Sequence, residues 1–102
     1  MRETFQVSLV TPAGEAYKGP ADSVVVPGVE GRFGVLVRHA PFLSALQPGV
    51  LELSSGGRQV LFAVGAGIVE VSREGVLVLA DTAEPVTSLE QATALAAGKD
   101  TR

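Results

Sequence analysis

The residue types that most often carry chemistry are sparse in this sequence. His39 is the single histidine and cysteine is absent, so a metal site built from several histidines or thiolates is excluded. No serine lies in the Gly-x-Ser-x-Gly pattern of a nucleophile elbow. Glu30, Asp81 and Glu84 remain as acid–base candidates, but solvated carboxylates are the usual case and no pattern brings two of them together. We therefore predict that the chain is not an enzyme and holds no metal or cofactor.

Two glycine patterns resemble phosphate-binding loops only superficially. Gly28, Gly31 and Gly34 have the wrong spacing for a dinucleotide loop and lead into an apolar stretch instead of a helix. The pair Gly65 and Gly67 is likewise not followed by a helix, whose N-terminus would receive the phosphate. These glycines predict tight turns and close backbone approach.

The segment 28–41 is the most distinctive candidate for a binding surface. It combines glycines with charged and apolar side chains: Val29, Glu30, Arg32, Phe33, Arg38 and His39. Loops held on a rigid β scaffold are common binding surfaces. Composition alone leaves two readings equally open, a partner-binding loop and a plain connection.

Length, charge and hydropathy limit the class of protein. The 102 residues suit one domain, with 46% hydrophobic residues as in ordinary globular folds. Eight basic against 11 acidic residues give a net charge of -3, which argues against nucleic-acid binding. No apolar run reaches the roughly 20 residues of a membrane-spanning helix, and the N-terminus does not resemble a signal peptide. We expect a cytoplasmic protein that reaches a membrane only through a partner.

The elements that would position these residues are short β-strands. Alternating or β-branched stretches separated by Gly and Pro turns predict strands at 5–10, 16–18, 23–26, 33–36, 50–53, 59–64, 68–71 and 76–80, with a further apolar stretch at 42–46. Many short strands with frequent turns indicate a sandwich or barrel. At the C-terminus, Ser88 and Gln91 form a capping box, and Leu89, Ala92, Leu95 and Ala96 share one helical face. One short C-terminal α-helix, ending near Gly98, is therefore expected to pack on the sandwich.

Several motifs in the correct order resemble the epsilon subunits of F-type ATP synthases, of the bacterial and chloroplast kind. The matching segments are 26–36, beginning Val-Pro-Gly-Val-Glu-Gly, and 39–50, beginning His-Ala-Pro-Phe-Leu, followed by 62–71 and 76–84. The N-terminal segment 5–19 also fits. The resemblance covers roughly residues 3–90.

The resemblance implies a fold and a place in a larger machine. The fold would be mainly β, a flattened β-sandwich of two five-stranded sheets at residues 1–86 that serves as a rotor domain, followed by a short helix and tail at 87–102. The domain would couple proton-driven or sodium-driven rotation of the c-ring to ATP synthesis through the gamma subunit, without catalysis of its own, with transient contact to the beta subunit. It would be peripheral, on the cytoplasmic face of the plasma membrane.

The same resemblance assigns two contact surfaces. The loop facing the c-ring would contain Glu30, Gly31, Arg32, Arg38, His39, Ala40 and Pro41. The surface facing gamma would contain Ile68, Val69 and Val71.

The sequence departs from the family pattern at its C-terminal end. Relatives usually carry two helices there, whereas this sequence stops at Arg102 after material for one. The family's Asp-x-x-Arg type ATP-binding pattern is also replaced by Leu89-Glu90-Gln91-Ala92. We therefore expect neither ATP binding nor inhibition by extended helices. The alternative function, a stand-alone β-sandwich binding or adaptor module, fits less well because such modules expose aromatic platforms and this chain has no Trp and one Tyr.

Overall fold

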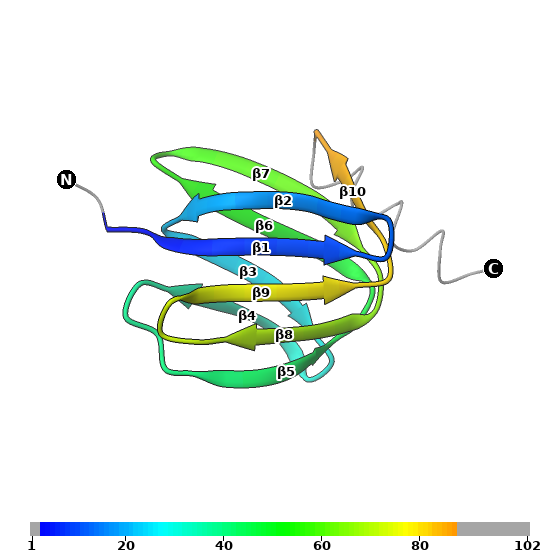
Figure 1. Cartoon of the computed structure of the whole chain (residues 1–102), viewed down its shortest axis with the longest axis horizontal. Helices are drawn as coiled ribbons and strands as arrows, with labels where there is room; N and C mark the ends of the chain where they lie inside the picture. The colour runs from blue at the N-terminus through cyan, green and yellow to red at the C-terminus, as the bar shows by residue number, and fades with distance from the viewer. Residues whose placement is uncertain (1–2, 88–102) are drawn as a thin grey trace.

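The computed structural model describes residues 3–87, which form ten β-strands (Figure 1). Their bounds are β1 Phe5–Thr11, β2 Gly14–Ala21, β3 Ser23–Gly28, β4 Gly31–Leu36, β5 Phe42–Leu46, β6 Gly49–Ser55, β7 Arg58–Val64, β8 Gly67–Val71, β9 Gly75–Ala80 and β10 Ala83–Val86. No helix that could cross a membrane occurs in residues 3–87. The mainly β prediction is confirmed, while the predicted C-terminal helix lies outside the described residues.

Hydrogen bonds join all ten strands into one sheet that folds over on itself. The strand order is β10-β7-β6-β3-β5-β8-β9-β1-β2, with β4 on the remaining edge of β3. Only one residue pair, Gly28 with Leu46, links β3 to β5 in the ladder. This narrow link divides the sheet into two layers (Figure 1). The expectation of two separate sheets is therefore corrected: the layers are a sandwich, but they are hydrogen-bonded at one corner.

The core lies between these layers and follows the period-two alternation of the strands. From the layer containing β1, β8 and β9, the side chains of Val7, Leu9, Val69 and Val78 point inward and are fully buried. Both layers contribute to a single apolar cluster, and no polar or charged side chain in residues 3–87 is buried. Burying alternate apolar side chains from both layers fixes each strand's register, since a one-residue slip would turn the apolar set outward.

A second, smaller apolar cluster lies on the other side of β6 and β7. Its buried members are Val50, Leu61 and Ala63, and Val86 of β10 packs against them. Their neighbours in the same strands, Leu51 and Phe62, belong to the main core. Residues 50–51 of β6 and 61–64 of β7 are therefore apolar on both faces of the sheet, which is why residues 61–64 form an unbroken buried run.

Successive strands reverse direction, so their connections gather at two opposite ends of the sandwich (Figure 1). One end carries the connections β2–β3, β4–β5, β6–β7 and β8–β9. The other end carries β1–β2, β3–β4, β5–β6, β7–β8 and β9–β10. This division decides which of the candidate residues share a surface.

Candidate binding surfaces

The residues predicted to face the c-ring do not form one surface. Glu30, Gly31 and Arg32 belong to the β3–β4 hairpin at one end, whereas residues 38–41 belong to the β4–β5 connection at the other end. Strand β4 separates the two groups by its whole length of six residues, or roughly 20 Å at about 3.3 Å per residue. The sequence predicted a strand between the two groups, at 33–36, but grouped their residues on one surface; the six-residue strand β4 carries the chain across the molecule and places them at opposite ends.

The β3–β4 hairpin presents a short, exposed tip. Gly31 has φ of 126°, a conformation that side-chain-bearing residues rarely adopt, and this turn places Val29 and Glu30 outward. Neither a hydrogen bond nor an ion pair within residues 3–87 involves the Glu30 carboxylate. Val29 is also exposed. The tip therefore exposes the Glu30 carboxylate, which has no bonding partner among residues 3–87, and the apolar side chain of Val29.

Arg32 lies in strand β4 and is engaged by the molecule itself. Its Nη1 donates a hydrogen bond to the Val50 carbonyl oxygen, and its Nη2 donates to Glu52 Oε2, both at 2.7 Å. Gln59 Nε2 donates to the other oxygen of Glu52 at 3.2 Å. Arg32 therefore connects β4 to β6 across the intervening strand β3, and Glu52 connects β6 in turn to β7. These bonds stabilise the outer face of this layer.

The β4–β5 connection is a structural corner held by His39. Its Nδ1 lies 2.8 Å from the Leu36 carbonyl oxygen, and its Nε2 lies 2.6 Å from the Ser72 carbonyl oxygen in the β8–β9 turn. The imidazole also meets the Phe5 ring edge-on at 5.0 Å between centroids. A neutral imidazole donates to one of these oxygens and the imidazolium donates to both. His39 therefore ties three separate segments together.

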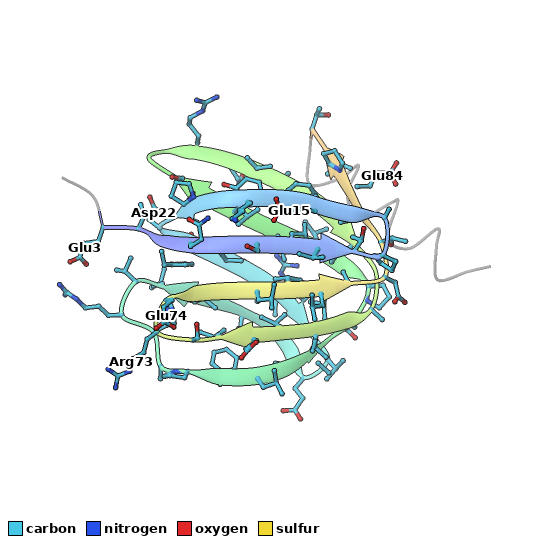
Figure 2. All side chains as sticks on the ribbon, in the orientation of Figure 1. Glu3, Glu15, Asp22, Arg73, Glu74 and Glu84 are labelled. Atoms are coloured by element: carbon cyan, nitrogen blue, oxygen red, sulfur yellow. The ribbon has the colours of Figure 1, made fainter. Side chains whose placement is uncertain are left out.

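Arg38 and its neighbours occupy the surface of the same corner. Arg38 has φ of 64°, unusual for a residue other than glycine, and its Nη2 lies 3.0 Å from Glu3 Oε2. Both side chains are exposed, so this pair contributes little to stability. Figure 2 shows Glu3, Arg73 and Glu74 at this same end of the sandwich, which therefore carries both charge signs. Ala40 and Pro41 complete the exposed connection.

The three residues predicted to face gamma point in different directions. Ile68 is 43% exposed, whereas Val69 and Val71 are 0% and 2% exposed and belong to the core. Because side chains alternate along β8, only Ile68 presents itself to a partner. The neighbouring strands extend this surface in register: Ala45, Ile68, Leu79 and Val10 lie side by side across β5, β8, β9 and β1.

We define the apolar strip as this row together with Leu43 and Leu77, which lie on the same outer face. Leu43 pairs with Glu70, and Leu77 pairs with Glu70 from the other side. Leu43 is 68% exposed and Leu79 is 39% exposed. The sequence did not single out Leu43, Leu77 and Leu79 as contact residues. In a continuous apolar stretch such as 76–79, the sequence does not show which side chains face the core, and the structure shows that Val76 and Val78 do.

The described residues show no organised reaction centre. No group of three or more His, Asp or Glu in residues 3–87 could hold a metal ion. Asp81 follows β9 and Glu84 lies on β10, while Glu30 lies on a separate hairpin tip. The described residues form instead a β-sandwich with an apolar core, an exposed apolar strip and a hairpin tip that exposes Val29 and Glu30.

These features define a β-sandwich interaction domain. The chain belongs to the ATP synthase delta/epsilon chain β-sandwich domain family, whose family model matches residues 4–86. The match spans nearly all of the described structure. The family suggested by the sequence motifs is thereby confirmed.

Curated relatives carry the same family name. A protein of Rhodopseudomonas palustris (strain BisB18) named ATP synthase epsilon chain is 47% identical over 89 residues, covering 87% of this chain and 66% of the relative. A protein of the same name from Bradyrhizobium sp. (strain BTAi1) is 47% identical over 94 residues, covering 92% and 69%. The chain thus spans about two thirds of the length of these relatives.

Solved structures support the fold. The chain superposes on a subunit of the Euglena gracilis mitochondrial ATP synthase with a TM-score of 0.78 and 23% identity, covering 99% of this chain and 64% of that one. A subunit of the Tetrahymena thermophila mitochondrial ATP synthase central stalk and c-ring structure gives a TM-score of 0.68 with 16% identity, covering 98% and 92%. At these identities the similarity establishes a shared fold.

Proposed function

We propose that this chain is an epsilon subunit in the central stalk of a rotary ATP synthase. In that role it couples proton-driven or sodium-driven rotation of the c-ring, through the gamma subunit, to ATP synthesis, and it catalyses no reaction itself. The observation that carries this proposal is the family match over residues 4–86, together with relatives at 47% identity named ATP synthase epsilon chain. The complex would hold the chain peripherally at the cytoplasmic face of the membrane.

The apolar strip is the surface that we assign to the gamma subunit. Ile68 lies at its centre, flanked by Ala45 and Leu79 on the adjacent strands. Its residues come from four strands of one layer, so they form a firm surface instead of a mobile loop. Exposed apolar surface of this kind usually marks a protein contact. Burying the apolar strip against gamma would attach the sandwich to that subunit, and the close-packed core would resist deformation.

The β3–β4 tip is the surface that we assign to the c-ring. Its Glu30 carboxylate has no partner within residues 3–87, whereas Arg38 meets Glu3 and His39 meets two backbone carbonyl oxygens at the other end. An unpaired carboxylate is free to bond with donors on a partner, and charge-assisted hydrogen bonds are short and directional. Residues 38–41 then serve mainly to hold the opposite corner together.

Substitution of Ile68 tests the gamma assignment. We expect Ile68→Glu to abolish co-purification with the gamma subunit, because a buried unpaired carboxylate costs several kcal/mol at an interface. The isolated variant should keep its fold, since Ile68 is already partly in water. Leu36→Glu is the matched control: Leu36 is also an exposed apolar strand residue, but it lies on β4 in the other layer. Retention of gamma by Ile68→Glu would refute the placement of this surface.

Charge-reversal variants test which end of the sandwich faces the c-ring. We expect Glu30→Lys to lower ATP-driven ion pumping in membrane vesicles, while ATP hydrolysis by the detached catalytic head is unchanged. Arg38→Glu, a matched reversal at the other end, should leave pumping near that of the unmodified complex. The reverse pattern would place the ring at the β4–β5 end.

A further inference from the structure

The sandwich has an open seam between strand β2 and the first half of strand β7. β2 is the last strand in the sheet order, so one of its edges has no partner strand among residues 3–87. On β7, the ladder with β10 covers residues 61–64, and no strand among residues 3–87 pairs with residues 58–60 on that side. Unpaired strand edges present backbone N–H and C=O groups that can accept another strand.

Between these edges lies a groove with an apolar floor. It has a volume of about 260 Å³, with Tyr17 of β2 on one wall and Leu53 and Val60 on the other. Val60 pairs with Leu53, a core residue, so its side chain is on the core side of the sheet. It is nevertheless 39% exposed. An apolar side chain directed toward the core yet open to water marks a place where the sandwich is not closed.

The mouth of the groove carries a positive charge. Arg58 lines it together with Ser54 and Ser55. No hydrogen bond or ion pair within residues 3–87 engages the Arg58 guanidinium. Arg58 also begins the unpaired part of β7, so the cation and the free backbone edge lie at the same place. A guanidinium in this position matches a carboxylate through paired N–H donors.

We propose that residues 58–60 of β7 are a strand-addition site for an extended, acidic segment of a partner polypeptide. The segment's backbone would continue the sheet beyond β7, one apolar side chain would fill the groove against Tyr17, Leu53 and Val60, and its carboxylate would bond to Arg58. Backbone pairing gives affinity in this recognition mode and the side-chain pocket gives selectivity. The site uses neither the apolar strip nor the β3–β4 tip, so it stands independently of the proposed rotor role.

A peptide titration of the full chain tests the proposal. The probe is the blocked peptide acetyl-Thr-Val-Thr-Asp-Thr-amide, in which Val and Asp are two residues apart and therefore lie on the same face of an extended strand, as Val60 and Arg58 do on β7. It is added to isotope-labelled protein and followed by NMR. We expect saturable shifts confined to residues 17–20, 53–55 and 58–60. Replacing the Asp of this peptide by Lys should weaken binding about tenfold or more, because the charge then opposes Arg58. A peptide N-methylated on alternate backbone nitrogens should lose binding, because it cannot complete the ladder.

Two variants complete the experiment. Arg58→Glu should weaken peptide binding about tenfold or more, and Arg73→Glu, an exposed arginine in the β8–β9 turn, should leave it unchanged. Shifts elsewhere on the molecule, no saturation, or equal binding by Arg58→Glu would each overturn the proposal. So would contacts between residues 87–89 and residues 58–60 in the free protein, because continuing the β10 register places Thr87 opposite Val60 and would fill the edge from within.

Discussion

Close backbone contacts explain glycines that the sequence marks only as turn formers. A Cβ placed on Gly67 would collide with the Leu79 carbonyl group on β9, and a Cβ on Gly75 would collide with the Gln6 carbonyl group on β1. Both obstacles are backbone atoms inside a ladder, which cannot move aside as a flexible side chain can. These two glycines therefore permit β8, β9 and β1 to lie close together beneath the apolar strip.

Alanine substitution tests whether a glycine is required by a close backbone contact. We expect Gly67→Ala to lower the free energy of unfolding by about 1–3 kcal/mol or more, because the added methyl forces β8 away from β9. Gly34→Ala is the control, since its Cβ would meet only the Val24 carbonyl oxygen, at 3.9 Å. Chemical denaturation monitored by circular dichroism gives both values. Equal midpoints for the two variants would contradict the backbone contact.

The roles of Arg32 and His39 show what a sequence cannot supply at this scale. Both residues stood out as charged or titratable groups in a glycine-rich segment. Their partners lie far along the chain: Glu52 for Arg32, and the Ser72 carbonyl oxygen for His39. No local pattern encodes such long-range bonds, and so two groups expected to face a partner are bound internally.

At the scale of elements, strand β10 depends on an apolar patch that lies outside the main core. It pairs with β7 along residues 61–64, and Val86 packs against Val50, Leu61 and Ala63. The sequence did not predict this strand. It is only four residues long and contains Pro85, which cannot donate to a ladder. Position at the sheet edge makes that proline tolerable.

Substitution at Val86 measures how much this patch contributes. We expect Val86→Asp to lower the free energy of unfolding by about 1–3 kcal/mol, because a polar group would meet the apolar patch without a bonding partner. Glu84→Gln on the same strand is the control, since Glu84 is exposed and should change stability little. Thermal and urea denaturation of the full chain provide the comparison. No loss in Val86→Asp would mean that β10 is held by its backbone bonds alone.

The strands with the clearest alternation were the most predictable elements. Phe5, Val7 and Leu9 define β1 by their spacing, and the turns at 11–14, 54–57 and 72–75 lie where Gly and Pro predicted them. The order of strands was not readable from the residues alone. β1 pairs in parallel with β9, and β3 meets β5 at one residue pair. Both pairings are determined by tertiary packing and not by any local sequence pattern. The family resemblance implied the sandwich, but only the structure shows the two backbone hydrogen bonds that join its layers, from Val29 N–H to the Ala45 oxygen and from Gln47 N–H to the Pro27 oxygen.

At the scale of the whole molecule, the first strand occupies a central place. β1 lies between β2 and β9, so the first strand of the chain is joined to a strand from late in the sequence within one layer. The parallel β1–β9 ladder connects residues about seventy positions apart, as the pair Val7 with Val76 illustrates. Contacts this distant in sequence carry a large entropic cost of closure. They form only when most of the sandwich is in place, which favours a single cooperative unit.

Hydrogen exchange can test whether the sandwich behaves as one stiff body suited to transmitting torque. We expect hydrogen-bonded amides of β1 and β9 to exchange only by global unfolding, at a free energy within the usual range of about 5–15 kcal/mol. Amides of the edge strands β4 and β10 should exchange through local opening at lower free energies. The measurement is residue-resolved exchange by NMR on the full chain, with a urea melt of the same sample as the reference for global stability. If β1 amides exchanged as readily as those of β4, the layer beneath the apolar strip would open on its own. That layer would then be too weak for the proposed contact of Ile68 and Leu79 with gamma to transmit torque.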